Sequence, residues 1–267
     1  MDHTVGAGDG TSEGPDISSR VRHGEAWIAT GRSGDEEALV AALGPAVTRA
    51  QADGADVVHW ETDEPEAIVD RVAEAVGLPV RRAILQMRRP LPLERALVEA
   101  TTPVPLRPIR PGTADEDAWV RCNNRSFADH PDQGRESRGS LRRAMDEPWF
   151  DADGLLLAEG PVPVDAGGDL DGFCWTKVHP PSASDPALGE IYVIGIDPRA
   201  GGRGLGRSLT VAGLEHLARV TDQALLYVDG DNVPARRLYD ALGFGTHHTR
   251  WVRSTPPIDR GGAAPPP

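Results

Sequence analysis

Hydrophobic residues follow two periods along the first third of the chain, one typical of strands and the other typical of helices. β-Branched and aromatic residues concentrate in short runs that predict strands over residues 26–29, 57–60 and 80–87. Between these runs, apolar residues recur every three or four positions and predict helices over residues 35–52 and 65–76. This alternation predicts an α/β domain.

A proline-rich stretch separates this part from the rest of the chain. Residues 88–110 hold five prolines and show no sustained period, so we expect the interdomain linker there. Beyond it, Thr113 followed by Glu116 predicts a capping box at the start of a helix. The same patterns predict strands over 106–109, 155–159, 173–178, 191–196, 224–228 and 246–253, and helices over 137–145, 206–219 and 233–242.

Residues 190–208 combine a strand, a glycine-rich loop and the start of a helix. A β-branched and aromatic strand over 191–196 is followed by three glycines within residues 201–205. Glycines let the backbone approach a ligand, and the free N–H groups at a helix N-terminus bind anions. Local positive charge comes from Arg199, Arg203 and Arg207. The stretch therefore predicts a site for phosphate groups.

The spacing of the glycines leaves several interpretations open. The dinucleotide fingerprint cannot be placed, because Leu209 stands where its last glycine would fall. A Walker A loop fits residues 201–208, but Arg207 replaces its lysine. The loop of the GCN5-related N-acetyltransferases (GNATs), Gln/Arg-x-x-Gly-x-Gly/Ala after a strand, is matched by Gly204 and Gly206, with glycine in its leading position. A glycine-rich turn without a ligand is the remaining alternative.

Residues 226–244 resemble the second hallmark of the GNAT family. In that family an asparagine precedes a helix that lies along the pantetheine arm, a tyrosine seven residues later faces the thioester, and Leu-Gly-Phe ends the helix. Asn232, Tyr239 and residues 242–244 match these positions. The resemblance implies an α/β (α+β) fold of tandem GNAT-like domains with mixed, mostly antiparallel central sheets. It also implies acetyl-CoA as the acetyl donor.

The two halves of the chain show a weak internal repeat. Residues 25–28 and 57–60 parallel residues 190–193 and 225–228, each pair with a helix between them. We interpret this as a degenerate duplication in which the N-terminal copy is reduced and lacks the glycine loop; chance similarity is the alternative. The expected organisation is a disordered N-terminus (1–19), a reduced GNAT-like domain (20–90), a linker (91–105), a catalytic GNAT domain (106–253) and a flexible tail (254–267).

The charge and cysteine content of the chain argue against several classes of binding partner. A formal net charge of −13 and a pI of about 5.0 argue against nucleic acid and anionic membranes. The chain has only two cysteines, Cys122 and Cys174, with no metal-ligand spacing, so we expect no metal site and a reducing cytoplasm. Lys177 is its single lysine. No apolar run is long enough to span a bilayer.

Several further motifs resemble the mycothiol synthases, which are two-domain actinobacterial GNATs. That family acetylates the cysteinyl amine of 1D-myo-inositol 2-(L-cysteinylamino)-2-deoxy-glucopyranoside (Cys-GlcN-inositol). The resemblance covers residues 80–253 well and 20–80 poorly. The usual first domain of the family is longer and holds a second acetyl-CoA, so this chain departs from the pattern there. The motifs begin at Leu106-Arg-Pro-Ile-Arg-Pro-Gly-Thr, Asn123-Asn-Arg-Ser-Phe, His130-Pro-Asp-Gln-Gly, Glu147-Pro-Trp-Phe, Trp175-Thr-Lys-Val-His and His247-His.

The resemblance implies roles for individual residues. Glu190 would be the general base for the amine, directly or through water, and the alternative is an exposed carboxylate at a strand end. Tyr239 would protonate the CoA thiolate, and the alternative is a core tyrosine. The cofactor would lie against Ile194, Gly195, Ile196, Gly201, Gly202, Arg203, Gly204, Leu205, Gly206, Arg207, Asn232, Val233, Pro234, Ala235, Arg236 and Arg237.

The acceptor would contact Glu190 and three further residues, Asp132, Lys177 and Tyr227. A compact ammonium such as that of Lys177 is not interchangeable with the guanidinium that this chain uses elsewhere. We expect His247 and His248 to be rim residues, and Cys174 to be packed rather than nucleophilic.

The resulting hypothesis is a monomeric N-acetyltransferase that forms mycothiol by direct attack of the amine, without an acyl-enzyme. One alternative is a GNAT that acetylates another small amine or a protein N-terminus. The other is an acyl-CoA-binding module without turnover.

Overall fold

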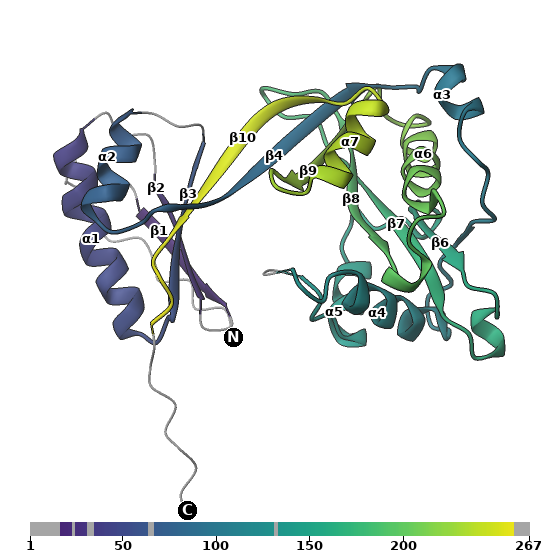
Figure 1. Cartoon of the computed structure of the whole chain (residues 1–267), viewed down its shortest axis with the longest axis horizontal. Coiled ribbons are helices and arrows are strands. Elements are labelled where there is room, and N and C mark those ends of the chain that lie inside the picture. Colours follow the sequence, from purple (N-terminus) through teal and green to yellow (C-terminus); the bar gives the residue numbers. More distant parts are fainter. Residues whose placement is uncertain (1–16, 23–24, 31–34, 64–66, 131–132, 259–267) are drawn as a thin grey trace, which may run out of the picture. The chain divides into compact units, whose positions relative to one another are not determined.

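The computed structural model describes residues 17–22, 25–30, 35–63, 67–130 and 133–258. These form two compact units (Figure 1). The first unit comprises residues 1–86, 228–233 and 246–267, and the second comprises 87–227 and 234–245. None of the described helices is long and apolar enough to cross a membrane.

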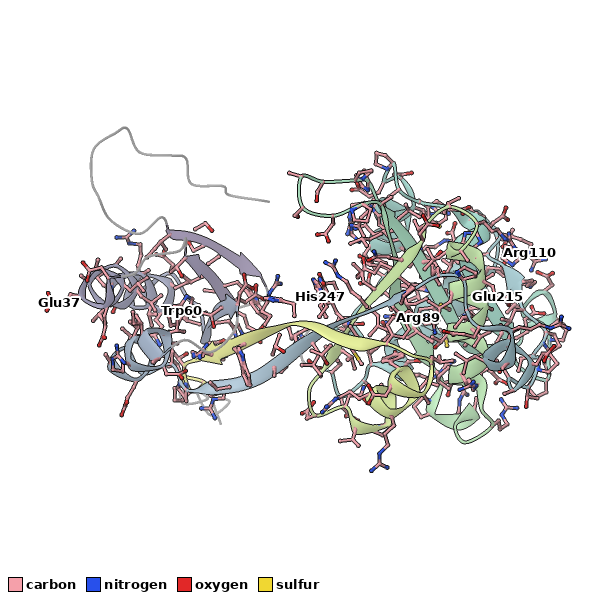
Figure 2. All side chains as sticks on the ribbon, turned by 90° about the horizontal axis from the view of Figure 1, so that it is seen from above. Glu37, Trp60, Arg89, Arg110, Glu215 and His247 are labelled. Carbon is pink, nitrogen blue, oxygen red and sulfur yellow. The ribbon has the colours of Figure 1, made fainter. Side chains whose placement is uncertain are left out.

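The first unit packs two helices against a sheet whose strand order is β1-β2-β3-β10-β4, to which β4 contributes residues 80–86. Strands β2 and β3 are parallel, whereas β1 with β2 and β3 with β10 are antiparallel. Trp60, at the centre of β3, is buried among the helices, while Glu37 points outward (Figure 2). The elements are β1 (Ile17–Arg22), β2 (Glu25–Thr30), α1 (Glu36–Ala52), β3 (Val57–Asp63), α2 (Ala67–Ala75), β4 (Val80–Pro90) and β10 (Gly245–Ser254).

Local signals explain why α1 forms where it does. The carboxylate of Asp35 accepts hydrogen bonds from the backbone N–H groups of Glu37 and Ala38, and so caps the helix. Leu39, Leu43, Val47 and Ala50, spaced three or four residues apart, are the residues that α1 buries in the core of the first unit.

The second unit is a mixed sheet with helices on both faces, and its strand order is β4-β9-β8-β7-β6-β5. Only β8 and β9 form a parallel pair among the registers from β5 to β9. The remaining elements are α3 (Arg95–Glu99), β5 (Arg107–Pro108), α4 (Asp115–Ser126), α5 (Arg138–Met145), β6 (Leu155–Glu159), β7 (Leu170–His179), β8 (Leu188–Ile196), α6 (Leu205–Leu217), β9 (Gln223–Asp229) and α7 (Val233–Ala241).

Glycines reveal which helix covers which face of this sheet. A Cβ at Gly213 of α6 would lie 2.7 Å from Cys174 Sγ. A Cβ at Gly195 would lie 3.0 Å from Ser126 Oγ of α4. Gly195 and Ile194, the partner of Cys174, are neighbours on β8 and so point to opposite faces. Therefore α4 and α6 cover opposite faces.

The structure divides the chain differently from the expected boundaries. The C-terminal strand β10 pairs with β3 and belongs to the first unit, whereas the end of β4 belongs to the second unit and lies next to β9. The first unit therefore includes a strand from the second copy of the repeat, β10, and the second unit includes the end of a strand from the first copy, β4. The pattern of hydrophobic residues within one copy predicts its strands but not which strands they pair with.

Smaller departures from the expectations have local causes. Residues 17–19 lie in β1, residues 95–99 of the expected linker form α3, and residues 254–258 bond to the first unit. The predicted capping box at Thr113 is wrong, because Glu116 accepts from the backbone N–H of Gly112 (2.6 Å) and α4 begins at Asp115.

Candidate functional site

The site centres on the point where β8 and β9 part. Their parallel ladder joins residues 189–191 to residues 224–226 and ends there. Tyr192 is an extra residue in β8, since Val193 pairs with Trp175 and Ile191 with Thr176. Such a bulge bends a strand and redirects its side chains. The β8 backbone beyond it, including the predicted cofactor residues Ile194, Gly195 and Ile196, keeps its partner on the β7 side only.

The glycine loop lies at the far end of this strand and leads into α6. Gly202 and Gly204 have φ angles of +79° and +74°, a conformation that only glycine adopts without strain. The backbone N–H of Ser208 is bonded to Gly204 O, so the N–H groups of Leu205, Gly206 and Arg207 are the unpaired ones expected at a helix start. These groups fit an anion such as a pyrophosphate.

The loop arginines are largely committed to other partners. Arg199 bonds to Asp197 and Asp169, and Arg203 bonds to Asp171. Arg207 Nε donates to Thr101 Oγ1 (2.9 Å), and its Nη2 donates to Leu97 O (3.2 Å), where residues 95–102 run past α6. Backbone N–H groups, more than arginine charge, are therefore what the loop offers to an anion.

Asp197 fixes the start of the loop. Its side chain is 1% exposed and accepts from the backbone N–H of Arg199 (2.9 Å) and from Arg125 Nε (2.6 Å). Hydrogen bonds from Arg199, which outweigh the opposing effect of burial, hold the pKa of Asp197 well below its usual range. The carboxylate is thus charged at neutral pH and ties β8 to α4.

Helix α7 places Tyr239 on the same face of the sheet as α6. Its ring is 6% exposed and packs edge-on against Phe244, with centroids 5.9 Å apart. The end of α7 is held by the buried Arg89, whose guanidinium donates to Leu242 O. Burial raises the pKa of Tyr239, with a smaller contribution from Cys174, so the phenol keeps its proton at neutral pH.

The other predicted cofactor residues of this segment lie at the start of α7. Asn232 belongs to the turn before the helix, and Asn232 and Val233 fall in the short segment 228–233 that is assigned to the first unit. Pro234 and Arg237 are exposed, and Ala235 and Arg236 are half-buried.

Glu190 lies on the opposite face from Tyr239. It pairs with Lys177 of β7 across the sheet, and its side chain is only 8% exposed. His179 Nε2 lies 2.6 Å from Glu190 Oε2. The base and the acid predicted from sequence are thus on the two sides of the sheet, beside the strand that loses its β9 partner.

Aromatic rings surround Lys177 on that face. Its Nζ lies 4.5 Å from the ring centroid of Trp149 and 5.1 Å from that of Tyr192. Trp175 packs against both rings at 5.6–5.7 Å. The ammonium is therefore held by cation–π contacts beside Glu190.

A cavity of about 320 Å³ opens next to this cluster. Its walls combine aromatic rings with polar side chains that suit a hydroxyl-rich ligand. They include Trp119, Trp175, Tyr192, Gln133, Glu136 and Ser140. Burial and the nearby carboxylates of Glu190, Glu136 and Glu147 raise the pKa of Tyr192, so the site around this ring is acidic and favours a cation.

The sequence predicted Lys177 and Glu190 as site residues, but their neighbours His179, Tyr192 and Trp149 were not among the predicted residues. Residues 175, 177 and 179 alternate along β7, and this period of two could have placed His179 beside Lys177. The contact across to Glu190 depends on the register of the β7–β8 hairpin, which the pattern of a single strand does not predict.

The remaining predicted residues are more scattered. Tyr227 is exposed on β9, and Asp132 lies outside the described residues. His248 Nε2 contacts Asp63 in the first unit (3.0 Å), and His247 is exposed on β10 (Figure 2). Cys174 is fully buried, and burial raises the pKa of its thiol to about 12, so it is not poised as a nucleophile.

The architecture defines a class of protein. A family described as "FR47-like protein" matches residues 183–252, which run from before β8 to within β10. A GCN5-related N-acetyltransferase from Sphaerobacter thermophilus has a TM-score of 0.63 at 21% identity, covering 91% of this chain and 77% of that chain. A tandem GNAT protein from the clavulanic acid biosynthesis pathway has a TM-score of 0.60 at 19% identity, and the match covers 92% of this chain and 80% of that chain. These likenesses show that the chain has the fold of the GCN5-related N-acetyltransferases, which confirms the predicted fold class.

Within that class, the chain is similar to mycothiol acetyltransferases. It is 48% identical to that of Salinispora arenicola over 198 residues, which are 72% of this chain and 61% of the relative. For Thermobispora bispora the identity is 48% over 184 residues, 68% of this chain and 59% of the relative. The chain therefore spans about three fifths of the length of these relatives. The family resemblance predicted from motifs is confirmed.

Proposed function

We propose that the second unit transfers the acetyl group of acetyl-CoA to the cysteinyl amine of Cys-GlcN-inositol, giving mycothiol. The observation that carries this proposal is the acidic, aromatic cavity beside Glu190, in a chain up to 48% identical to mycothiol acetyltransferases. An amino sugar offers hydroxyls to Gln133, Glu136 and Ser140, and its ammonium suits the surrounding carboxylates.

The donor would lie where β8 and β9 part. The unpaired backbone edge of residues 192–196 would hold the pantetheine arm, and an N–H group there would polarise the acetyl carbonyl. The free N–H groups at the start of α6 would bind the pyrophosphate. A Cβ at Gly206 would make only ordinary contacts at 3.6 Å to Leu238 and 4.0 Å to Ile196, so a methyl group would fit there.

The reaction needs one base and one acid. Glu190 takes a proton from the ammonium, and the free amine attacks the acetyl carbon. The C–S bond then breaks, and the departing thiolate takes the proton that the raised pKa keeps on Tyr239. The second proton of the amine nitrogen restores the phenol. No acyl-enzyme is required, in keeping with the buried thiol of Cys174.

Lys177, Tyr227 and Asp132 are proposed to contact the acceptor. Lys177 is fixed among aromatic rings beside Glu190, which is suitable for a hydrogen bond to a sugar hydroxyl. We further propose that the enzyme is a cytoplasmic monomer and that the first unit does not catalyse transfer.

An acetyl-transfer assay tests this function. The full chain is incubated with acetyl-CoA and Cys-GlcN-inositol, free cysteine, glucosamine or a short peptide, and products are identified by mass spectrometry. We expect N-acetylation of Cys-GlcN-inositol with the highest kcat/KM of the four. Faster transfer to another amine would assign a different acceptor. Binding of acetyl-CoA without transfer to any amine would indicate a binding module.

A further inference from the structure

The proposed reaction releases a proton that Glu190 and Tyr239 alone cannot pass to solvent. An ammonium nitrogen carries three protons, whereas the product amide keeps one and the CoA thiol takes one. One proton per turnover must therefore reach solvent. Glu190 receives it, but the Glu190 side chain is only 8% exposed. A base that is buried needs a route by which it is deprotonated again.

His179 provides a contact between Glu190 and solvent. Its Nε2 lies 2.6 Å from Glu190 Oε2, and its side chain is 38% exposed. The pairing follows from the β7–β8 hairpin, in which Lys177 faces Glu190 and His179 lies two residues further along the same face. An imidazole can accept a proton on one nitrogen and release one from the other.

We propose that His179 is a positioning residue for Glu190 and carries its proton to solvent. After deprotonation of the amine, the Glu190 carboxyl gives its proton to Nε2 of the neutral imidazole. The imidazolium then releases the Nδ1 proton to water or buffer, and the carboxylate is ready for the next turnover. The hydrogen bond also fixes the orientation of the carboxylate. This inference rests on the proposed function.

The charges around Glu190 are consistent with this assignment. Lys177 lies beside it on β7 and Tyr192 follows it on β8, and the carboxylates of Glu136 and Glu147 lie near enough to Tyr192 to act on it. Leu225, its partner on β9, carries no charge. Of the two basic groups on β7, Lys177 is enclosed by aromatic rings. His179 contacts the Glu190 carboxylate and has a side chain that is 38% exposed, so it is the basic group that links Glu190 to solvent.

The first test compares His179→Gln with His248→Gln in the full chain. Glutamine retains a donor near the position of Nε2 but cannot relay a proton. His248 is a matched control, because its Nε2 contacts Asp63 at 3.0 Å from a strand of the first unit. We expect kcat of His179→Gln to fall about 10-fold or more, less than the 10²–10⁴-fold typical of a general base, with KM values unchanged. His248→Gln should match the wild type.

The dependence of turnover on buffer concentration distinguishes a proton relay through His179 from a purely structural role of this residue. At constant pH and ionic strength, imidazole buffer should restore turnover of His179→Gln in proportion to its concentration and leave the wild type unaffected. Equal turnover of His179→Gln and wild type would overturn the proposal. So would a loss that no buffer restores, since it would show a structural role alone.

A measurement without any acceptor keeps this inference separate from the proposed function. If Nε2 is bonded to Glu190 in solution, its ¹⁵N resonance should shift in Glu190→Gln but not in Glu215→Gln, a surface change on α6 (Figure 2). An unchanged His179 resonance would refute the pairing. Failure of the wild type to acetylate Cys-GlcN-inositol, with the resonance shifted as expected, would instead count against the proposed acceptor.

Discussion

At the scale of residues, the environments of Glu190 and Tyr239 suit opposite tasks. Glu190 lies beside a lysine and a histidine on the face that bears the acidic cavity. Tyr239 lies on the other face in an apolar setting, where burial raises its pKa and so preserves its proton. A carboxylate that accepts a proton and a phenol that retains one are what amine attack on a thioester requires.

Replacing Glu190 with glutamine should remove the base while retaining its volume. We expect kcat near neutral pH to fall by roughly 10²- to 10⁴-fold. Raising the pH supplies neutral amine from solution, so the difference from wild type should shrink in alkaline buffer. A pH–rate profile with saturating acetyl-CoA measures this. A constant difference across the profile would contradict the role of Glu190 as base.

Replacing Tyr239 with phenylalanine should slow the departure of the CoA thiolate. Because only the hydroxyl is removed from a ring that packs on Phe244, the fold and the affinity for acetyl-CoA should change little. The fall in kcat should not be reversed at high pH, unlike that of Glu190→Gln. Turnover equal to wild type would remove Tyr239 from the mechanism.

At the scale of elements, the two copies of the repeat differ in how their parallel strands separate. In the first unit β2 and β3 stay paired over five positions, from Glu25 with Val57 to Ala29 with Glu61. In the second unit β8 and β9 pair over only three positions. A pantetheine arm needs an unpaired strand edge, which β8 offers beyond residue 191.

We therefore expect one acetyl-CoA per chain. Isothermal titration of the full chain should saturate at a molar ratio of one. Saturation at two equivalents would show that the first unit also binds the donor despite its closed strand pair.

A branched side chain at Gly206 should block the donor without disturbing the helix. Since a Cβ there meets nothing closer than 3.6 Å, Gly206→Ala should be tolerated by the fold, and Gly206→Val should extend further into the space proposed for the pyrophosphate. We expect Gly206→Val to lose measurable acetyl-CoA binding by calorimetry while its circular dichroism spectrum is retained. Unchanged affinity in a folded variant would contradict the assignment of this loop.

Much of this element structure was predictable from sequence, and the reasons differ from element to element. The run 191–196, its glycines and α6 carry local signals, so β8 and the loop were found. The contact of His179 with Glu190 depends on the register of the β7–β8 hairpin, in which Lys177 faces Glu190, and the pattern of a single strand does not fix that register. The capping box at Thr113 was wrong because Glu116 accepts from the backbone N–H of Gly112 instead of that of Thr113, and α4 begins at Asp115.

At the scale of the molecule, ion pairs to one buried carboxylate hold the second unit together at the site. Asp197 joins the end of β8 to Arg125 of α4 and to Arg199 of the loop. Its depressed pKa means that the folded state binds this proton less readily than the unfolded state. The stabilisation is therefore present above the ordinary pKa of 3.8 and is lost as the pH falls below it.

Replacing Asp197 with asparagine should destabilise the second unit by about 2 kcal/mol, because Arg125 and Arg199 lose their hydrogen bonds to a charged acceptor. The loss should be largest at neutral pH and diminish in acid, where the wild type loses the same interaction. Hydrogen exchange at the amides of β7 and β8 measures the free energy of opening. The exposed pair of Arg95 and Glu99 serves as control, and Glu99→Gln should change that free energy by less than about 1 kcal/mol.

Because β10 belongs to the first unit and the end of β4 to the second, the order of synthesis affects how the two sheets form. The sheet of the first unit needs β10, which the ribosome delivers only after residue 244 has been added. At typical rates of synthesis, residues 87–244 take roughly 10 to 30 s, during which the edge of β3 has no partner from its own unit. The order of translation thus leaves one nascent sheet open until the other unit has been made. For the same reason, a gene cut between the two copies would encode two incomplete sheets rather than two domains.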